Sequence, residues 1–417
     1  MIQTLKYKKV FVAALVAAAA TLFGCTQDET VQERSQQPIG FNVVVDQTKA
    51  TRSISSLNSS NLTKFDIWAY RADQTNSDPV MGVDAQTGYQ ISKTSKFGII
   101  AELQDPANGI WGYTDRYQVT YWPNDGTQQL AFYAFAPTTV GNTVPNLTHH
   151  ITKADHAFDY IAAEGDNYSH SDQRDLIVAG KTVNLTDIKQ QTASAWMTVN
   201  LTFKHALSQI MFDAKLAPNH PDFRVVIHSI AICNISRQGT CTIGSTDGTP
   251  TWTNTTTKTR DAYTVVTGTP GTGITLYSSD GTDGAAADAV ALSNGTAANN
   301  SDNLMLIPQT LTAWDVSGTP LKVDNENQTG SYLKIRCDIT QKGFNLLKEQ
   351  YVYVPFGNGS GVHDTWDGTW VPGKSYTYHL LFGLGRNSDG LVNSEDITYT
   401  VSVADTWTTP VESSIPL

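Results

Sequence analysis

The sequence predicts an all-β protein made of two antiparallel β-sandwiches in series, and three observations lead to this prediction. Apolar and polar residues alternate in short runs along most of the 417-residue chain, which is the pattern of strands that bury one face. The runs are rich in β-branched and aromatic residues, and Gly, Pro, Asn and Asp separate them. Roughly twenty such runs are present, more than the seven to nine strands of one sandwich.

The N-terminal residues have the layout of a secretory signal peptide. Lys6, Lys8 and Lys9 form a basic head, and the following segment Val10–Phe23 carries no charge. As a helix this segment would reach about 21 Å, whereas the hydrocarbon core of a bilayer is about 30 Å thick. We therefore expect residues 1–24 to be a signal peptide and not a membrane span.

The four residues Leu22–Cys25 resemble the lipobox of bacterial lipoproteins. The resemblance implies that Cys25 becomes the first residue of the exported chain and carries a thioether-linked diacylglycerol. Several acyl chains on one residue suffice for stable anchoring, because each buried CH2 contributes ~0.8 kcal/mol. Asp28 and Glu29 resemble the acidic residues that direct lipoproteins to the outer face of certain Gram-negative outer membranes. The alternative is an ordinary secreted protein with a cysteine near its cleavage site.

Two groups of candidate strands flank a polar segment at Thr186–Ala195, and this segment is the expected domain boundary. The strands expected before it are Phe41–Val45, Lys64–Tyr70, Tyr117–Trp122 and Leu130–Ala136. Those expected after it are Met197–His205, Phe223–Ile232, Tyr332–Ile339, Tyr351–Pro355, Ser375–Phe382 and Ile397–Ala404. The expected domains are residues 53–190 and 191–417.

Two segments of the second domain depart from the strand pattern. Residues 245–303 are rich in Gly, Thr, Asn and Ser, and we expect an insertion of loops and short edge strands there. The segment Lys342–Glu349 is the best candidate for a helix. The net charge of −11 and the pI of about 5.2 argue against a surface that binds nucleic acid.

Three cysteines remain after Cys25. Cys233 and Cys241 flank a turn-like segment and are placed to face each other across a hairpin, whereas Cys337 is distant in sequence. No two of them have the CxxC spacing of metal ligands. We expect them to be buried thiols, and the pairing of Cys233 with Cys241 stays open.

The segment Gly368–Ser375 fits the pattern of a phosphate-binding P-loop, G-x-x-x-x-G-K-[ST]. That loop must open a helix whose N-terminal amides bind phosphate. Here Pro372 lies inside the loop, and the residues that follow continue as an alternating strand. We therefore interpret the segment as a turn that enters a strand.

No combination of residues predicts catalysis, a cofactor or a metal. His149, His150, His156 and His170 lack the spacing of a zinc site on a helix, and we expect solvated loop histidines. His205 lies inside a strand and is expected to be a hydrogen-bonded core residue. Nucleophile motifs such as G-x-S-x-G are absent from the sequence.

An acidic and aromatic segment near the second domain's end leaves two alternatives open. Asp364 and Asp367 flank Trp366 there, and Trp370 follows. The two tryptophans suit a sugar-stacking surface, so a monomeric surface lipoprotein that binds glycans is one alternative. An exported hydrolase is the other, and it requires two carboxylates at a fixed separation.

The order of several motifs resembles the fimbrillin family, the subunits of type V pili, over most of the exported chain. The motifs are KATRS, KFDIWAY, YWP, LAFYAFAP, DLIVAG, VNLTFKHALSQIMFD, WVPGKSYTYHLLF and ITYTVSVADTW. The resemblance implies two transthyretin-like β-sandwiches and a structural, non-enzymatic role. It also implies a subunit of a surface fimbrium that supports adhesion, whose precursor is held in the outer membrane by the lipid on Cys25.

The resemblance further implies maturation and polymerisation. A trypsin-like protease would cut between Arg52 and Ser53, and residues 25–52 would leave as a lipid-bearing propeptide that contains the strand Phe41–Val45. A strand from another fimbrillin subunit would fill the groove that this loss exposes. The expected donor strand has Ile397, Tyr399, Val401 and Val403 on one face. The alternative role of this strand is to close its own sandwich.

Overall fold

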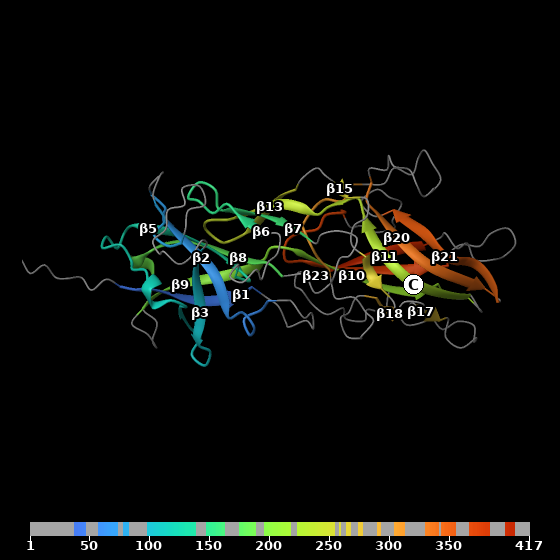
Figure 1. The fold of residues 1–417 in the computed structure, drawn as a ribbon, viewed down its shortest axis with the longest axis horizontal. Coiled ribbons are helices and arrows are strands. Elements are labelled where there is room, and N and C mark those ends of the chain that lie inside the picture. The colour runs from blue at the N-terminus through green and yellow to red at the C-terminus, as the bar shows by residue number, and fades with distance from the viewer. Residues whose placement is uncertain are drawn as a thin grey trace, which may run out of the picture.

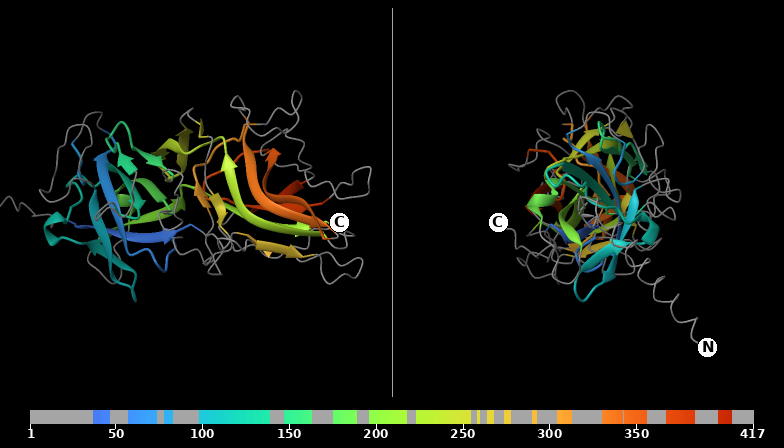
Figure 2. Two further views of the ribbon diagram at one scale, coloured as in Figure 1. Left: turned by 45° about the vertical axis from the view of Figure 1, so that its right-hand side comes forward. Right: turned by 90° about the vertical axis from the view of Figure 1, so that its left-hand side faces the viewer.

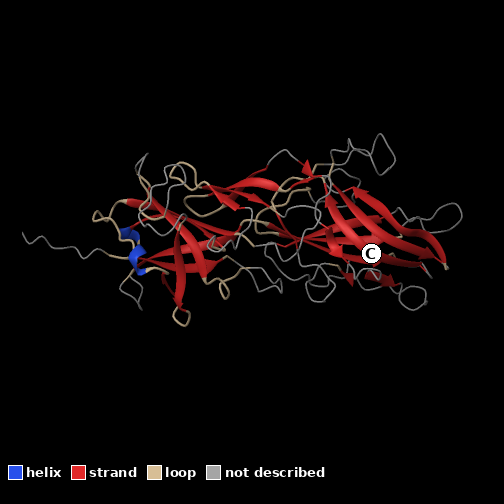
Figure 3. Cartoon of the chain, viewed as in Figure 1, coloured by secondary structure: helices blue, strands red, loops and turns tan. Residues whose placement is uncertain are grey.

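The structure is a computed structural model that describes the following residues: 37–46, 57–73, 78–82, 98–138, 147–162, 175–188, 196–217, 223–254, 258–259, 264–267, 274–277, 290–292, 304–312, 330–341, 343–355, 367–383 and 397–404. Strands dominate these residues, which confirms the predicted all-β class (Figure 3). Within the described ranges the helices are the short 3-10 turns η1 (Arg116–Gln118) and η3 (Leu185–Asp187). No helix in the described part is long and apolar enough to cross a membrane.

The first unit is a barrel formed by strands that lie at one end of an elongated molecule (Figure 1). Its strands follow the order β1 (Ile39–Val45), β4 (Ile110–Tyr113), β3 (Ile99–Asp105), β2 (Lys64–Arg71), β5 (Gln129–Ala136), β8 (Ile177–Asn184) and β9 (Met197–His205). The first and last strands pair in parallel, from Ile39 opposite Met197 to Val45 opposite Phe203. The barrel therefore closes between strands that are far apart in sequence.

Strand β2 is buried on both faces, which explains why its sequence is almost continuously apolar. Phe65 and Ile67 point into the barrel core. Trp68 and Tyr70 belong to a second hydrophobic cluster on the other face of the sheet, and the Trp68 ring stacks on Phe135 with the ring centroids 5.3 Å apart. Strands of this kind cannot show strict alternation, because neither face meets water.

The second unit contains two sheets that share one hydrophobic core. One sheet has the order β18 (Val290–Ala291), β10 (Ser208–Leu216), β22 (Ser375–Phe382) and β23 (Ile397–Ala404), with β19 (Leu304–Leu306) also paired to β10. The other has the order β16 (Thr264–Thr267), β11 (Phe223–Cys233), β20 (Tyr332–Gln341) and β21 (Phe344–Pro355), with β17 (Ile274–Tyr277) also paired to β11. Buried side chains of both sheets belong to one cluster, as in a sandwich.

A further sheet joins the two halves of the chain. Its order is β14 (Pro250–Asn254), β13 (Gln238–Ile243), β7 (Ala157–Ile161) and β6 (Leu147–His149). Strands β6, β7 and β13 lie along one side of the molecule, between the barrel and the second unit (Figures 1 and 2). The short strands β12 (Ile235–Ser236) and β15 (Lys258–Thr259) pair beside it. This ladder thus pairs strands that precede the expected domain boundary with strands that follow it.

Strand pairing crosses the boundary expected at Thr186–Ala195 in both directions. Strand β9 begins after this segment and still completes the barrel, because it provides the parallel partner of β1. Strands β6 and β7 precede the segment and pair with β13, which follows it. Division of the chain into domains at residue 190, and a transthyretin-like topology for each half, stay predictions.

The helix predicted at Lys342–Glu349 is wrong. Residues from Phe344 onward lie in strand β21, which forms a long antiparallel hairpin with β20. The hairpin turns at Gly343, whose φ of +77° is a conformation that favours glycine. Pairing with β20 therefore overrides the moderate helix propensity of this segment.

The turn between β13 and β14 packs directly on the barrel. Lys204 Nζ lies 3.2 Å from Asp247 Oδ2 and 2.8 Å from Thr249 Oγ1. The hydroxyl and the backbone N–H of Thr249 are the main groups that lower the pKa of Asp247 to about 2. Thr182 on β8 donates from Oγ1 to the carbonyl oxygen of Ser245 at 2.8 Å. Polar contacts thus hold the turn on β8 and β9.

Substitution of Gly180 by Ala is expected to displace this turn. A Cβ atom at Gly180 would lie 1.9 Å from the carbonyl oxygen of Gly244, which is backbone and cannot rotate away. We expect a loss of about 1–3 kcal/mol in unfolding free energy, the range for overpacked sites. Gly126→Ala is the matched control, because its Cβ would meet its nearest neighbour at 3.5 Å. Thermal unfolding measures both, and equal midpoints would contradict the packing described here.

Candidate functional site

Strand β1 is the first part of the candidate site, because it is a strand of the barrel wall with a neighbouring strand on each side. Its two neighbours are β9, parallel over the whole length of β1, and β4, which meets it at Phe41 opposite Trp111. The N–H of Met197 donates to the carbonyl of Pro38 at 3.0 Å, and the carbonyl of Phe203 accepts from Asp46 at 2.7 Å. Removal of β1 would leave these backbone groups of β9 unpaired.

The core-facing side chains of β1 fill an aromatic part of the barrel. Ile39 and Phe41 are fully buried and Val45 is nearly so. The Phe41 ring lies 5.8 Å from the ring of Phe65 and 5.8 Å from that of Tyr113, both in edge-on geometry. Loss of β1 would therefore open an apolar groove lined by aromatic side chains.

One buried hydroxyl binds the backbone of β1. Tyr113 donates from its hydroxyl to the carbonyl oxygen of Ile39 at 3.0 Å. Burial raises the pKa of Tyr113 well above its usual range, so the phenol stays protonated and remains a donor. Any strand that replaces β1 must present a carbonyl at the position of Ile39, because a buried hydroxyl without an acceptor is destabilising.

The predicted sites Cys25, Arg52 and Ser53 lie outside the described residues. The chain leaves β1 at Asp46 and is described again from Leu57. The Leu57 N–H donates to Asp175 Oδ2 at 2.6 Å, and Asp175 Oδ1 lies 3.0 Å from His205 Nδ1. His205 is thus the hydrogen-bonded core histidine that the sequence predicts. A cut after Arg52 would separate β1 from the rest of the chain and leave the contact of Leu57 intact.

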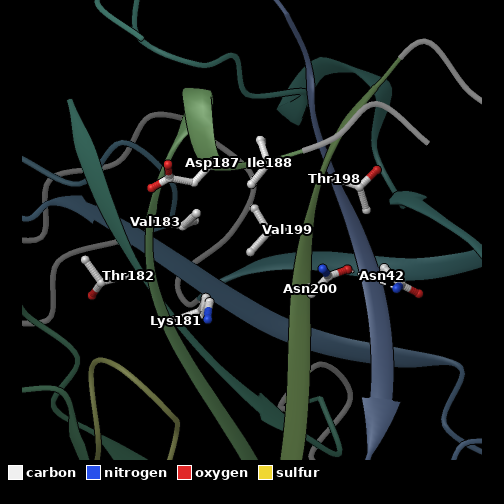
Figure 4. Close-up of a pocket in the computed structure, with 9 residues that line it drawn as sticks. All are labelled: Asn42, Lys181, Thr182, Val183, Asp187, Ile188, Thr198, Val199 and Asn200. Atoms are coloured by element: carbon white, nitrogen blue, oxygen red, sulfur yellow. Dashed lines mark hydrogen bonds between the residues drawn. The ribbon is translucent and has the colours of Figure 1, made fainter. Parts of the chain in front are cut away.

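A cavity of about 640 Å3 lies beside β1, where strands β8 and β9 diverge (Figure 4). The two strands pair only at Ile177 with His205 and at Val178 with Lys204. Continuation of that register would place Thr182 opposite Asn200, but no such pairing exists. Instead the cavity opens there, lined by Asn42, Lys181, Thr182, Val183, Asp187, Ile188, Thr198, Val199 and Asn200.

The cavity joins polar groups of β1 to those of the barrel strands. Asn42 Nδ2 donates to Asn200 Oδ1 at 3.0 Å, across the parallel pair. In Figure 4, Val183, Ile188 and Val199 lie between the diverging strands and form the apolar part of the cavity lining. The alternation of polar and apolar residues in the sequence gave no signal for this cavity, because it arises from an interrupted strand pair.

Strand β23, the predicted donor strand, pairs with β22 over its whole length and lies at the end of its sheet. Ile397 and Tyr399 are buried, and the Tyr399 ring lies 5.5 Å from that of Tyr378. Val401 is partly buried and packs against the core, whereas Val403 is 45% exposed. The structure thus shows β23 in its own sheet, and its role as a donor stays a prediction.

A histidine connects β23 to two other strands. His379 on β22 lies with Nδ1 2.7 Å from Asp213 Oδ2 on β10 and with Nε2 2.8 Å from Ser402 Oγ on β23. The sequence did not reveal this link, because the three residues come from segments far apart in the chain. It holds the C-terminal end of β23 on its sheet.

Other residues considered in the sequence take structural positions. Trp370, one of the two tryptophans proposed to stack on sugars, is 1% exposed, and its Nε1 donates to the Tyr378 hydroxyl at 2.9 Å. Trp370 is therefore unable to act as an exposed platform, while Trp366 and Asp364 lie outside the described residues. The P-loop-like segment is a turn that enters β22, which confirms its structural interpretation.

The described histidines and cysteines are likewise structural. His150 Nε2 lies 2.7 Å from Asp159 Oδ2, and the His156 ring stacks on Tyr133, where burial lowers the pKa of His156. His170 lies outside the described ranges. Among the residues described, no group of three or more His, Cys, Asp or Glu side chains is arranged to bind a metal. The three described cysteines, Cys233, Cys241 and Cys337, are buried free thiols.

Comparison with known proteins gives one family match and several distant structural matches. The model of the fimbrillin-like family matches residues 48–405, which include every described strand after β1. Among curated proteins, none matches the chain by sequence. A solved protein of Bacteroides uniformis assigned to cell adhesion has 14% identity and a TM-score of 0.43, over 89% of this chain and 99% of that chain.

Two solved fimbrial proteins of Porphyromonas gingivalis are similar to the same extent. The tip fimbrial protein Mfa3, truncated at its C-terminus, has 10% identity and a TM-score of 0.40, over 89% of this chain and 99% of that chain. A fimbrilin, FimA, has 12% identity and a TM-score of 0.40, over 88% of this chain and 96% of that chain.

Truncation of Phe41 to Ala is expected to destabilise the barrel by about 3–5 kcal/mol, the range for a buried phenylalanine that leaves a cavity. Val44→Ala on the same strand is the matched control, because Val44 is 52% exposed and its loss removes few contacts. Hydrogen exchange of the β9 amides reports on the barrel separately from the second unit. Equal exchange rates in the two variants would show that β1 contributes little to the barrel.

Proposed function

The chain belongs to the fimbrillin-like family, and from this membership we propose that it is a structural subunit of a fimbrium that reaches the surface as an outer-membrane lipoprotein. Family membership supports a fimbrial role in adhesion and association with other fimbrial subunits. The finer steps of the proposal are lipidation of Cys25, cleavage after Arg52 and polymerisation by strand exchange. No catalytic step is part of this function.

The position of β1 is the observation that carries the proposal. The strand lies between β4 and β9, its core face is buried, and it precedes the segment that holds Arg52. Cleavage after Arg52 would turn β1 into a separate, non-covalently held strand. Its departure would expose an apolar groove and leave the edges of β4 and β9 that now pair with β1 unpaired, which together form a template for an incoming strand.

Strand β23 supplies the complementary part of the proposal. A strand at the end of a sheet has fewer backbone bonds to break than an interior strand, and β23 pairs only with β22 among the described strands. Ile397, Tyr399, Val401 and Val403 present one apolar face to a groove. Because donor and acceptor surfaces differ, each joined subunit still offers one of each, and growth is open-ended.

Substitution Arg52→Ala is expected to block maturation and leave full-length lipoprotein monomers on the cell surface. The measurement is N-terminal sequencing of the surface protein, together with the ladder of polymers on a denaturing gel. Lys49→Ala is the control, because it changes a basic residue of the same segment and should leave a mature chain that begins at Ser53. Wild-type surface protein that begins at Cys25 and still forms fibres would refute cleavage at this site.

Substitution Cys25→Ser is expected to abolish labelling by radioactive palmitate and to release the precursor from the membrane fraction. The physical reason is the loss of the acyl chains, each buried CH2 of which contributes ~0.8 kcal/mol to anchoring. Thr26→Ser tests the neighbouring residue and should retain both label and anchoring. Retained labelling in the Cys25 variant would exclude this residue as the lipid attachment site.

A further inference from the structure

We propose that Asp213, His379 and Ser402 form a catalytic triad that hydrolyses small carboxylic esters. This activity goes beyond the proposed fimbrial role and does not depend on it. The three residues come from the adjacent strands β10, β22 and β23 of one sheet. Asp213 lies opposite His379, and Ser402 follows two positions after Thr400, which is the residue opposite His379 on β23. Strand pairing thus places the three side chains together on one face of the sheet.

The two contacts of the His379 ring have the order found in serine hydrolases. Nδ1 lies 2.7 Å from Asp213 Oδ2, and Nε2 lies 2.8 Å from Ser402 Oγ. A carboxylate can only accept a hydrogen bond, so the proton of the neutral ring is on Nδ1. The Nε2 lone pair then accepts the hydroxyl proton of Ser402. The geometry therefore makes Ser402 the nucleophile, His379 its base and Asp213 the residue that orients the base.

The burial of the three side chains suits these roles. The side chains of His379 and Asp213 are 8% and 14% exposed, whereas Ser402 is an exposed residue. Charges attract more strongly where water is largely excluded, so the Asp213 carboxylate stabilises the imidazolium that forms during the reaction. The exposure of Ser402 lets a substrate carbonyl reach Oγ from solvent.

The outer side of β23 supplies a donor for the oxyanion. Gln209 on β10 donates its N–H to the carbonyl of Lys374, so the even-numbered residues of β22 direct their backbone groups toward β10. The odd-numbered residues face β23, where Thr377 lies opposite Ser402. The next residue, Val403, therefore directs its N–H away from β22, to a side where no described strand pairs. The N–H of the residue after the nucleophile is an oxyanion donor in the α/β-hydrolases.

Hydrolysis by these groups proceeds in two steps. Ser402 Oγ adds to the ester carbonyl carbon while its proton moves to His379 Nε2, and the Val403 N–H binds the oxyanion. The bond from carbon to the alcohol oxygen then breaks, and the alcohol leaves with the proton from His379. Water attacks the acyl-serine in the same way, the carboxylic acid leaves, and Ser402 regains its proton.

The position of the nucleophile limits the class of substrate. Ser402 lies on a strand at the end of its sheet, and the neighbouring Val403 is 45% exposed, which gives an acyl group one apolar side chain to contact. A peptide has a poorer leaving group than an ester, and its hydrolysis draws on binding energy from many contacts along an extended chain. A short-chain carboxylic ester requires fewer contacts and is therefore the substrate class that fits.

Labelling with a fluorophosphonate and hydrolysis of 4-nitrophenyl acetate test the triad in the purified full-length protein. An activated serine displaces fluoride from the phosphorus atom, and mass spectrometry is expected to find the label on Ser402. Ser402→Ala should abolish the label and reduce hydrolysis to the rate in buffer. Thr400→Ala is the matched control, because it removes the neighbouring hydroxyl on the same face of β23. It should retain both the label and the rate.

The role of Asp213 as a positioning residue requires a readout that stability alone does not change. Asp213→Asn is expected to lower kcat by about 100-fold or more with KM unchanged, the range for general-base catalysis, and Asp213→Glu should restore part of it. Thermal unfolding identifies the variants that remain folded. Wild-type protein without label on Ser402 would overturn the triad, and so would undiminished labelling of a folded His379→Ala variant.

Discussion

The parallel pairing of β1 with β9 is the constraint on which the first half of the molecule depends. The paired residues of these strands, such as Ile39 and Met197, lie 158 positions apart in sequence, and their ladder closes a sheet whose other seam, between β8 and β9, is paired at only two positions. Because that second seam is short, the barrel has little to replace β1 if the strand is lost. The buried side chains of Ile39 and Phe41 add to this dependence, since the aromatic cluster around Phe65 is packed against them. Strand β1 therefore holds the barrel together through its ladder with β9 and its buried side chains.

The connection between the two halves of the molecule depends on a separate sheet. The sheet formed by β6, β7, β13 and β14 takes two strands from each side of the predicted domain boundary. Asp159 on β7 accepts a hydrogen bond from Thr240 on β13 at 2.6 Å, and its other oxygen lies 2.7 Å from His150. The turn between β13 and β14 then contacts Lys204 and Thr182 of the barrel. Through these contacts the two halves share hydrogen bonds as well as apolar surface.

Local patterns in the sequence predicted most strands correctly and their partners poorly. The strand predicted at Tyr117–Trp122 is wrong, because η1 occupies Arg116–Gln118 and Tyr121 forms only an isolated bridge with Pro38. Alternation or short apolar runs rich in β-branched and aromatic residues identified β1, β2, β5, β9, β22 and β23, and the turn at Gly368–Ser375 followed from Pro372 and the strand after it. The place of β9 in the barrel could not be predicted, because a strand carries no local mark of a partner that precedes it by such a distance. The helix predicted at Lys342–Glu349 failed for the related reason that pairing with β20 overrode propensity. The cavity beside Lys181 and the link from His379 to Ser402 depend on the same long-range pairings.

The sheet shared by the two halves has a mechanical consequence. A rod made of two bodies joined by a single chain segment bends at that segment under load, whereas a joint made of a hydrogen-bonded ladder resists bending until several bonds break together. The pairing of β7 with β13 spans the two halves of the chain and would resist such bending. In a fibre of such subunits the flexible points would then be the contacts between subunits. Its stiffness under flow would be set by those contacts, and each subunit would keep a constant length.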